Sequence, residues 1–137
     1  MKLVLDSNVI IAAFATRGLC SSLFEYCLES HEVVLSEPII LEVTRILRKK
    51  IKLPRNIVLQ IESYLRSVCT MIKPAEVDSS ICRDKSDLVI LGTAKAERAK
   101  YIVSGDKDLL ILKKYLDIAI IDPRAFWQAG KNEKTTS

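Results

Sequence analysis

The stretch KLVLDSNVIIAAF (residues 2–14) begins with a short run of apolar residues and places a carboxylate, Asp6, directly after it. Two later segments, YIVS (101–104) and IAII (118–121), are almost as continuously apolar. Strands that are covered on both faces show such runs, whereas strands with one solvated face alternate between apolar and polar residues. These segments therefore predict a mainly parallel sheet with helices on both of its faces.

Strand patterns alternate with helical patterns along the chain, which is typical of βα units. In SEPIILEVTRILRKK (36–50), the apolar residues recur with helical period and cations collect at the C-terminal end. Further helices are predicted over residues 54–67 and 86–99. The predicted strands cover residues 2–5, 32–35, 69–73, 101–104 and 118–121. The predicted fold is α/β, a three-layer α/β/α sandwich around a central, mainly parallel five-stranded sheet.

Length and composition favour one domain. A chain of 137 residues with 49% hydrophobic residues can bury a sizeable core. We predict a single domain over residues 1–129 and a disordered tail over residues 130–137, because GKNEKTTS is polar and aperiodic. No apolar run approaches the roughly 20 residues that span a bilayer, and the N-terminal segment does not resemble a signal peptide. We therefore expect a cytoplasmic protein with no membrane partner.

Four acidic residues follow the predicted strands. Asp6 comes directly after the first strand, and Asp106 follows the fourth strand across one glycine. Glu42 lies about one turn into the helix after the second strand, and Asp87 begins the helix that follows the third. Functional groups of open parallel sheets gather beyond the carboxyl ends of the strands. We therefore expect these four carboxylates to converge at one edge of the sheet.

Each acid also has a purely structural explanation. Asp84, Asp87 and Asp106 could stabilise helix N-termini, and Glu42 could be a solvated helix residue. Four carboxylates within several ångströms of one another, however, cannot all stay ionised without a cation between them. The four cysteines lack CxxC spacing and the chain has one histidine, so a zinc site is not indicated. Oxygen ligands favour Mg²⁺ or Mn²⁺, the ions of phosphodiester hydrolysis.

In these motifs the chain resembles the PIN-domain family, metal-dependent ribonucleases that include the VapC-type toxins of prokaryotic toxin–antitoxin systems. The resemblance runs from about Lys2 to Trp127 and rests on LVLDSNVIIAAF, LSEPIILEVTRIL, CRDKSDLVILGTA and YIVSGDKDLL, in the family's order. It implies a Rossmann-like fold. The catalytic and metal-binding residues that it implies are Asp6, Glu42, Asp87 and Asp106.

The activity implied by the resemblance is endonucleolytic cleavage of RNA by a metal-activated water, with Mg²⁺ or Mn²⁺ as cofactor. A toxin role, a cognate antitoxin and a homodimer are further expectations from the family. Asn8 and Ser104 match positions that hydrogen-bond around the cluster, so we expect them to support the ligands. Asp108 matches a recurrent position, although the helix dipole explains it equally well. The segment RDKSD has fewer aspartates than many toxin-like relatives, which leaves the role of Asp84 open.

Positive charge is densest in RILRKKIKLPR (45–55), and the formal net charge is +4. Such a block could hold RNA phosphates, but cations also stabilise a helix C-terminus whatever the function. Arg45 in this block and Lys107 beside the fourth acid are the candidates for substrate contact.

Two alternatives remain beside the nuclease interpretation. One is a non-catalytic PIN-like module that binds RNA or an antitoxin. The other is a phospho-acceptor receiver domain, which needs an acid pair after the first strand and a lysine after the fifth. In this chain Ser7 follows Asp6, and the segment DPRAF after the fifth strand has no lysine.

Overall fold

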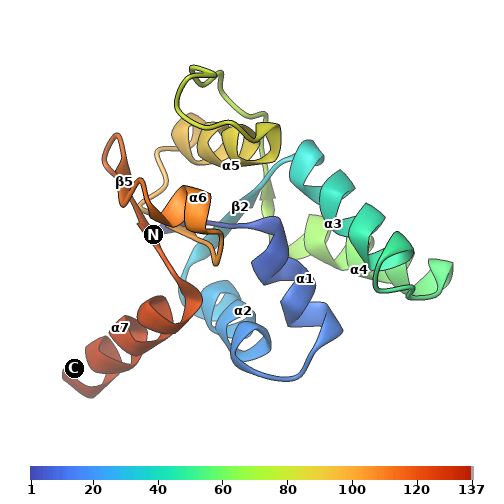
Figure 1. Ribbon diagram of the computed structural model, residues 1–137. Helices are drawn as coiled ribbons and strands as arrows, with labels where there is room; N and C mark the ends of the chain where they lie inside the picture. The colour runs from blue at the N-terminus through green and yellow to red at the C-terminus, as the bar shows by residue number, and fades with distance from the viewer. Residues whose placement is uncertain (137) are drawn as a thin grey trace.

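The structure is a computed structural model that describes the backbone of residues 1–136 and the side chains of residues 1–130. Within this part of the chain, six strands form one sheet in the order β3-β2-β1-β4-β6-β5 (Figure 1). All pairings are parallel except that of β5 with β6. The strands are β1 (Lys2–Leu5), β2 (Glu32–Leu35), β3 (Thr70–Met71), β4 (Tyr101–Val103), β5 (Lys114–Tyr115) and β6 (Ile118–Ile121). The predicted mainly parallel sheet is confirmed.

The prediction of five strands was wrong, because β5 was missed. This strand is two residues long and pairs with β6 across the two-residue turn Leu116–Asp117. A segment so short shows no period, and Leu116 is not a residue that usually marks a tight turn. The third strand also covers only Thr70–Met71, inside the predicted range 69–73.

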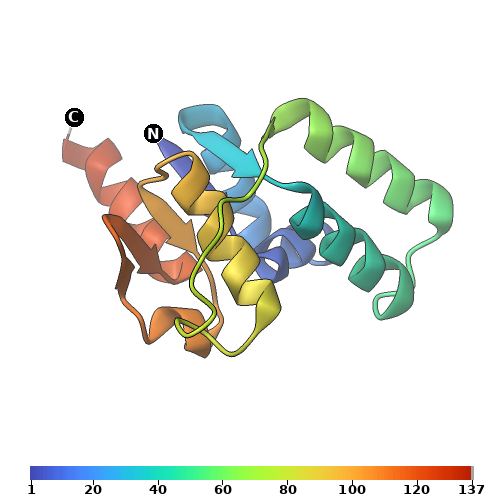
Figure 2. The same ribbon diagram turned by 90° about the horizontal axis from the view of Figure 1, so that it is seen from above.

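Helices cover both faces of the sheet, as predicted. Helix α5 packs against β1, β2 and β4 on one face, while α1 and α2 cover the other and α7 packs on α2 (Figure 2). Helices α3 and α4 contact each other and project past the β3 edge. The helices are α1 (Ser7–Ala15), α2 (Leu19–Ser30), α3 (Glu37–Lys49), α4 (Arg55–Val68), α5 (Lys85–Ala96), α6 (Lys107–Leu110) and α7 (Pro123–Thr136).

The three helices predicted explicitly are confirmed as α3, α4 and α5, with ends shifted by up to three residues. Helix α7 includes positions 130–136 of the segment for which the sequence predicts a disordered tail. Ser137 of that segment lies outside the described residues. The limits of the predicted domain, residues 1–129, stay a prediction.

The core follows from the continuous apolar runs of the central strands. Leu3, Val4 and Leu5 of β1 are fully buried, as are Ile102 and Val103 of β4. Burying an apolar side chain of this size contributes about 1.5–3 kcal/mol, so β1 and β4 form a rigid centre. The residues that follow these two strands are therefore held in fixed positions.

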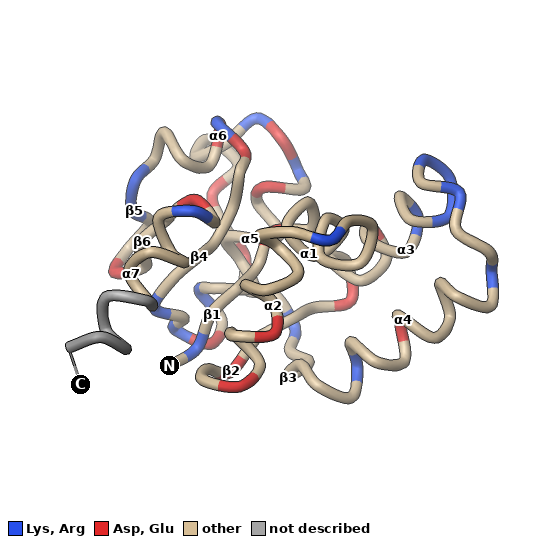
Figure 3. Tube along the Cα trace, turned by 90° about the horizontal axis from the view of Figure 1, so that it is seen from below, with Lys and Arg blue, Asp and Glu red and all other residues tan. Residues whose placement is uncertain are grey.

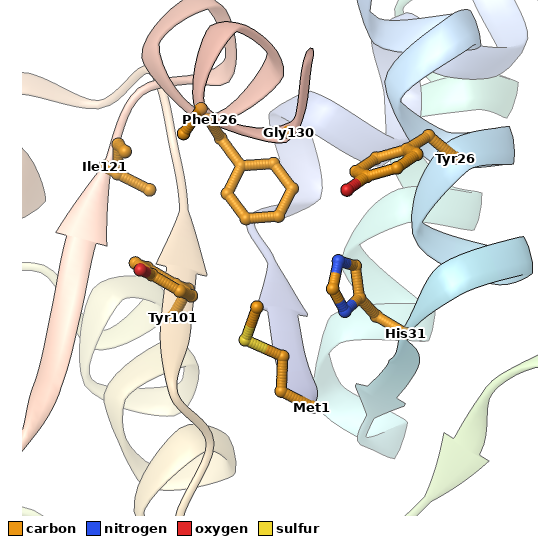
Figure 4. A pocket seen from close by; sticks show the side chains of 8 residues that line it. Met1, Tyr26, His31, Tyr101, Ile121, Phe126 and Gly130 are labelled. Atoms are coloured by element: carbon orange, nitrogen blue, oxygen red, sulfur yellow. The ribbon is translucent and has the colours of Figure 1, made fainter. Parts of the chain in front are cut away.

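An aromatic cluster joins α7 to α2 and β4 at the amino ends of the strands. Figure 4 shows the rings of Tyr26, His31, Tyr101 and Phe126 around one small cavity of about 20 Å³. The ring centroids of Tyr101 and Phe126 lie 5.6 Å apart in an edge-to-face arrangement. A Cβ atom at Gly130 would lie 2.9 Å from the Tyr26 hydroxyl oxygen, so glycine permits this close packing.

Among the described residues, no single helix is long and apolar enough to cross a membrane. Helices α1 and α2 satisfy the criteria of length and composition only as a pair, and they are bent by 110° relative to each other.

The close contact of α5 with the loop before it yields a stability prediction. A Cβ atom at Gly92 would lie 2.3 Å from the carbonyl oxygen of Ala75, whose N–H donates to the Gly92 carbonyl at 2.9 Å. We expect Gly92→Ala to lower the free energy of unfolding by about 1–3 kcal/mol, because the loop must move. Gly18→Ala is the control, since a Cβ atom there meets nothing within 4 Å. Urea unfolding of both variants measures the difference, and equal stabilities would contradict the prediction.

Candidate metal centre

Two buried carboxylates lie at the carboxyl edge of the sheet. Asp6 follows β1 and is 6% exposed, and Asp87 lies in the first turn of α5 and is 3% exposed. The backbone N–H of Asp6 donates to the carbonyl oxygen of Val103 at 2.9 Å, so the pairing of β1 with β4 continues up to this carboxylate. Aspartate is rarely so enclosed unless it is paired or binds a metal.

Two further carboxylates approach Asp87 from the segment after β4. Asp106 is the N-cap of α6, and the backbone N–H of Asp108 donates to its Oδ1 at 2.9 Å. One carboxylate oxygen from each of Asp87, Asp106 and Asp108 lies within 4.8 Å of the other two. Asp108 therefore belongs to this group of acids by position, and it also lies in the first turn of α6.

Ser104 connects Asp6 to this group. Its hydroxyl donates to Asp6 Oδ2 at 2.6 Å, and the same oxygen accepts the backbone N–H of Asp106 at 2.9 Å. Ser104 is fully buried at the end of β4. The structure thus places Ser104 where a supporting residue was predicted, between two of the acids.

Glu42 reaches the same edge from α3, and Ser7 holds it there. The Ser7 hydroxyl donates to Glu42 Oε2 at 3.0 Å. Ser7 is 1% exposed, whereas the predicted supporting residue Asn8 is exposed and its side chain makes no hydrogen bond to the described residues. Sequence reasoning missed Ser7, although its position directly after Asp6 is a usable signal.

Burial and like charge raise the pKa of both enclosed acids. The pKa of Asp87 rises to about 7 because the carboxylate is desolvated and lies beside Asp106, with smaller contributions from Asp84 and Asp6. The pKa of Asp6 is raised mainly by burial and is partly restored by the Ser104 hydrogen bond. Asp106 and Glu42 both act on Asp6 as like charges, which shows that the predicted acids lie within electrostatic range of one another.

A divalent cation fits this donor set. Asp87 Oδ2 is a buried oxygen without a hydrogen-bond partner among the described residues, although buried carboxylate oxygens are normally satisfied. The ligand atoms of Asp87, Asp106 and Asp108 are carboxylate oxygens, which suit hard ions such as Mg²⁺ or Mn²⁺. A cation here would provide the missing partner and reduce the repulsion between Asp87 and Asp106.

Asp84 occupies a different position. It is exposed, and its Oδ1 accepts the backbone N–H of Ser86 at 2.8 Å as the N-cap of α5. This contact is the ordinary stabilisation of a helix start. Asp84 acts on Asp87 as a like charge, so it adds to the negative potential without joining the close group.

Cations flank the acids on one side. Arg45 and Lys85 line a hollow of about 360 Å³ that also contains Glu42, and Arg45 continues into a second hollow of about 420 Å³ between α3 and α4. The basic block lies at the tip of these two helices (Figure 3). Lys107 is exposed in α6, next to Asp106. Both predicted substrate-binding candidates thus lie near the acids, and Lys85 is an additional cation that sequence reasoning missed.

Comparisons with known proteins identify a family and a similar fold. A family model described as a PIN domain matches residues 2–108. Eleven chains of solved structures match. One is from the crystal structure of VapBC2 from Rickettsia felis bound to a DNA fragment from their promoter, with 15% identity, a TM-score of 0.61 and coverage of 89% of this chain and 98% of that chain. That likeness concerns the fold. No match was found among curated proteins.

The crowded acids predict an unusual pH dependence for the metal-free protein. Because the folded state raises the pKa of Asp87 from 3.8 to about 7, folding binds a proton, and the free energy of unfolding falls as pH rises across that range. Asp87→Asn removes this contribution, so in EDTA the variant should lose less stability than the wild type between about pH 5 and pH 8. Thermal unfolding across this pH range measures the effect.

Asp117→Asn provides the control, because Asp117 is an exposed aspartate in the β5–β6 turn. Its pH dependence should match that of the wild type. In addition, Mn²⁺ at neutral pH should raise the thermal midpoint of the wild type and of this control, but much less that of Asp87→Asn. Identical pH slopes for all three proteins would contradict the assignment of Asp87 as a destabilised carboxylate.

Proposed function

This chain belongs to the PIN-domain family, and from that premise we propose that it is a metal-dependent endoribonuclease that hydrolyses RNA phosphodiester bonds. Proteins of this family are generally nucleases. The observation that carries the proposal is the buried, unpartnered Oδ2 of Asp87 beside Asp106 and Asp108. A site with this charge and burial is costly to a protein unless it binds a cation.

The proposed metal ligands are the acids at the carboxyl edge of the sheet. Asp6, Asp87 and Asp106 are in the proposed set with Glu42. Asp108 is added because one of its carboxylate oxygens lies within 4.8 Å of an oxygen of Asp87 and of Asp106. When bound, Mg²⁺ or Mn²⁺ supplies the Lewis-acid chemistry that phosphodiester hydrolysis requires. Ser104 keeps Asp6 oriented and Ser7 keeps Glu42 oriented, so neither carboxylate has to reorganise when substrate arrives.

The cations near the site would hold the substrate. An RNA phosphate is repelled by unneutralised carboxylates, so it needs positive charge on the approach to them. Arg45 and Lys85 line the hollow that contains Glu42, and Lys107 lies beside Asp106. We therefore assign these three side chains to phosphate binding near the acids.

The biological setting is part of the same proposal. We infer a toxin of a prokaryotic toxin–antitoxin system that acts on RNA in the cytoplasm as a homodimer and pairs with an antitoxin. The support is the resemblance of the motifs to VapC-type toxins and the shared fold with a protein from the VapBC2 complex. A small gene beside this one that encodes a partner forming a stable complex on co-expression would support this setting.

Cleavage of single-stranded RNA tests the catalytic proposal. The purified protein should cut RNA with Mn²⁺ or Mg²⁺ and lose this activity in EDTA. Asp6→Asn and Asp87→Asn should each lower the rate by about a hundredfold or more, because each removes a proposed ligand of an ion whose charge stabilisation is worth several kcal/mol. Glu29→Gln is the control, because Glu29 is an exposed acid of α2 outside the group of proposed ligands. Metal-dependent activity that survives in both ligand variants would refute the site.

Ser7 and Asn8 offer a sharper comparison between neighbouring residues. Ser7→Ala removes the hydrogen bond to Glu42, so we expect cleavage to fall by about 10- to 100-fold, as for other residues that orient metal ligands. Asn8→Ala should change the rate much less, because Asn8 is exposed. Rates measured over a Mn²⁺ titration show whether Ser7→Ala weakens metal use, which excess Mn²⁺ would partly restore. The reverse order of the two effects would favour the role that the sequence predicts for Asn8.

A further inference from the structure

A second hollow lies at the end of α5 that is remote from the acids. It has a volume of about 730 Å³ and is lined by the C-terminal end of α5 and by the turn between β5 and β6. Its size falls in the range of pockets that hold small ligands, roughly 300–1,000 Å³. Asp87 lies in the first turn of α5, whereas Arg98 follows its last turn, so the length of the helix separates the two sites (Figure 2).

The hollow is strongly cationic. Lys95, Arg98 and Lys100 line it with Asp117 as the one acid among its lining residues. Lys114 on β5 adds a further cation at the adjacent hairpin, seen in blue in Figure 3. A nearby acid, Glu97, does not offset this charge, because it is paired with Lys2 at 3.0 Å. The ligand that suits the hollow is therefore an anion.

Two lining residues adopt a backbone conformation that favours glycine. Arg98 has φ 51° just after α5, where the N–H of Ala99 donates to the carbonyl of Ala94 at 2.9 Å and closes the helix end. Glycine is the usual residue at this position of such a helix end. Leu116 has φ 55° at the first position of the two-residue turn between β5 and β6, where glycine is again preferred.

These side chains carry a conformational cost and contribute little to packing in return. Leu116 is 60% exposed and Arg98 is exposed. Left-handed backbone at a residue other than glycine costs about 1 kcal/mol or more, and it is frequent at binding sites. At this conformational cost the backbone places the cation Arg98 and the apolar side chain of Leu116 at the rim of the same hollow.

We propose that this hollow binds a nucleoside phosphate unit, either as a free nucleotide or as one residue of an RNA strand. Arg98 and Lys100 hold the phosphate, while Lys95, whose Nζ donates to the carbonyl oxygen of Glu76 at 2.9 Å, adds positive charge beside them. Leu116 offers an apolar surface to the base or the sugar, and the Asp117 carboxylate accepts hydrogen bonds from hydroxyl or amino groups. This combination of cations, an apolar ledge and one acceptor matches a nucleotide better than it matches a simple anion.

The experiment measures binding in EDTA, so it does not depend on cleavage or on the acids. The probes are AMP, a short oligoadenylate RNA, inorganic phosphate and polyglutamate, with affinities from calorimetry. The variant is Arg98→Gly, which removes a cation and also relieves the left-handed backbone, so its thermal midpoint should equal or exceed that of the wild type. The matched control is Lys52→Gly, because Lys52 is another cation with positive φ, at 63°, in the connection between α3 and α4.

We expect Arg98→Gly to weaken binding of AMP about tenfold, while Lys52→Gly leaves it within about twofold. Leu116→Gly should weaken AMP binding and leave inorganic phosphate unaffected, because it removes only the apolar surface. If AMP does not bind but the oligoadenylate does, and Arg98→Gly weakens it more than Lys52→Gly, the ligand is a residue of an RNA strand.

Three results would overturn the proposal. The first is that Arg98→Gly binds AMP and the oligoadenylate as the wild type does. The second is that inorganic phosphate displaces the bound probe as effectively as AMP, which would show that the nucleoside is not recognised. The third is that polyglutamate binds more tightly than the oligoadenylate in a manner that depends on Arg98, which would identify a surface for an acidic protein.

Discussion

Electrostatic repulsion between carboxylates at the carboxyl edge of the sheet is the constraint on which the rest of this structure depends. Asp6 and Asp87 are both buried, and the pKa of each is raised by its surroundings. Repulsion of this kind would push flexible segments apart, so the acids must be attached to elements that cannot move. The fully buried strands β1 and β4 and the helix α5 that packs across them meet this requirement.

The same constraint explains the distribution of charge over the molecule. The buried acids lie at the carboxyl edge of the sheet, while cations collect on the α3–α4 pair and at the far end of α5. The net charge of +4 hides this separation. The surroundings of Asp87 are negative, whereas the α3–α4 pair and the far end of α5 are positive. The cations would attract a polyanion to the molecule. It could approach the acids only when the negative charge of the acids is neutralised.

The sequence predicts the sheet and three of the helices because their signals are local. Continuous apolar runs define β1, β4 and β6, and apolar period with charged ends defines α3. The acids of the site could be predicted because they come after strands in the sequence. Ser104 was also predicted as a supporting residue. The choice of Ser7 over Asn8 was not, because it depends on which of the two side chains faces Glu42 on α3. β5 escaped prediction for a related reason, since its pairing is set by the left-handed turn at Leu116 rather than by composition.

The buried side chain of Ser104 connects the rigid core to the acids. Its hydroxyl donates a hydrogen bond to Asp6 and accepts one from the N–H of Asp106, so it acts as both donor and acceptor. The N–H of Asp108 in turn donates to Asp106, which extends the chain of hydrogen bonds from β1 to α6. These hydrogen bonds position Asp6 and Asp106 before any ligand binds, whereas Asp87 Oδ2 has no hydrogen-bond partner among the described residues. The unsatisfied oxygen is therefore the point at which a cation gains the most, since it meets a preorganised group and no rearrangement opposes its binding.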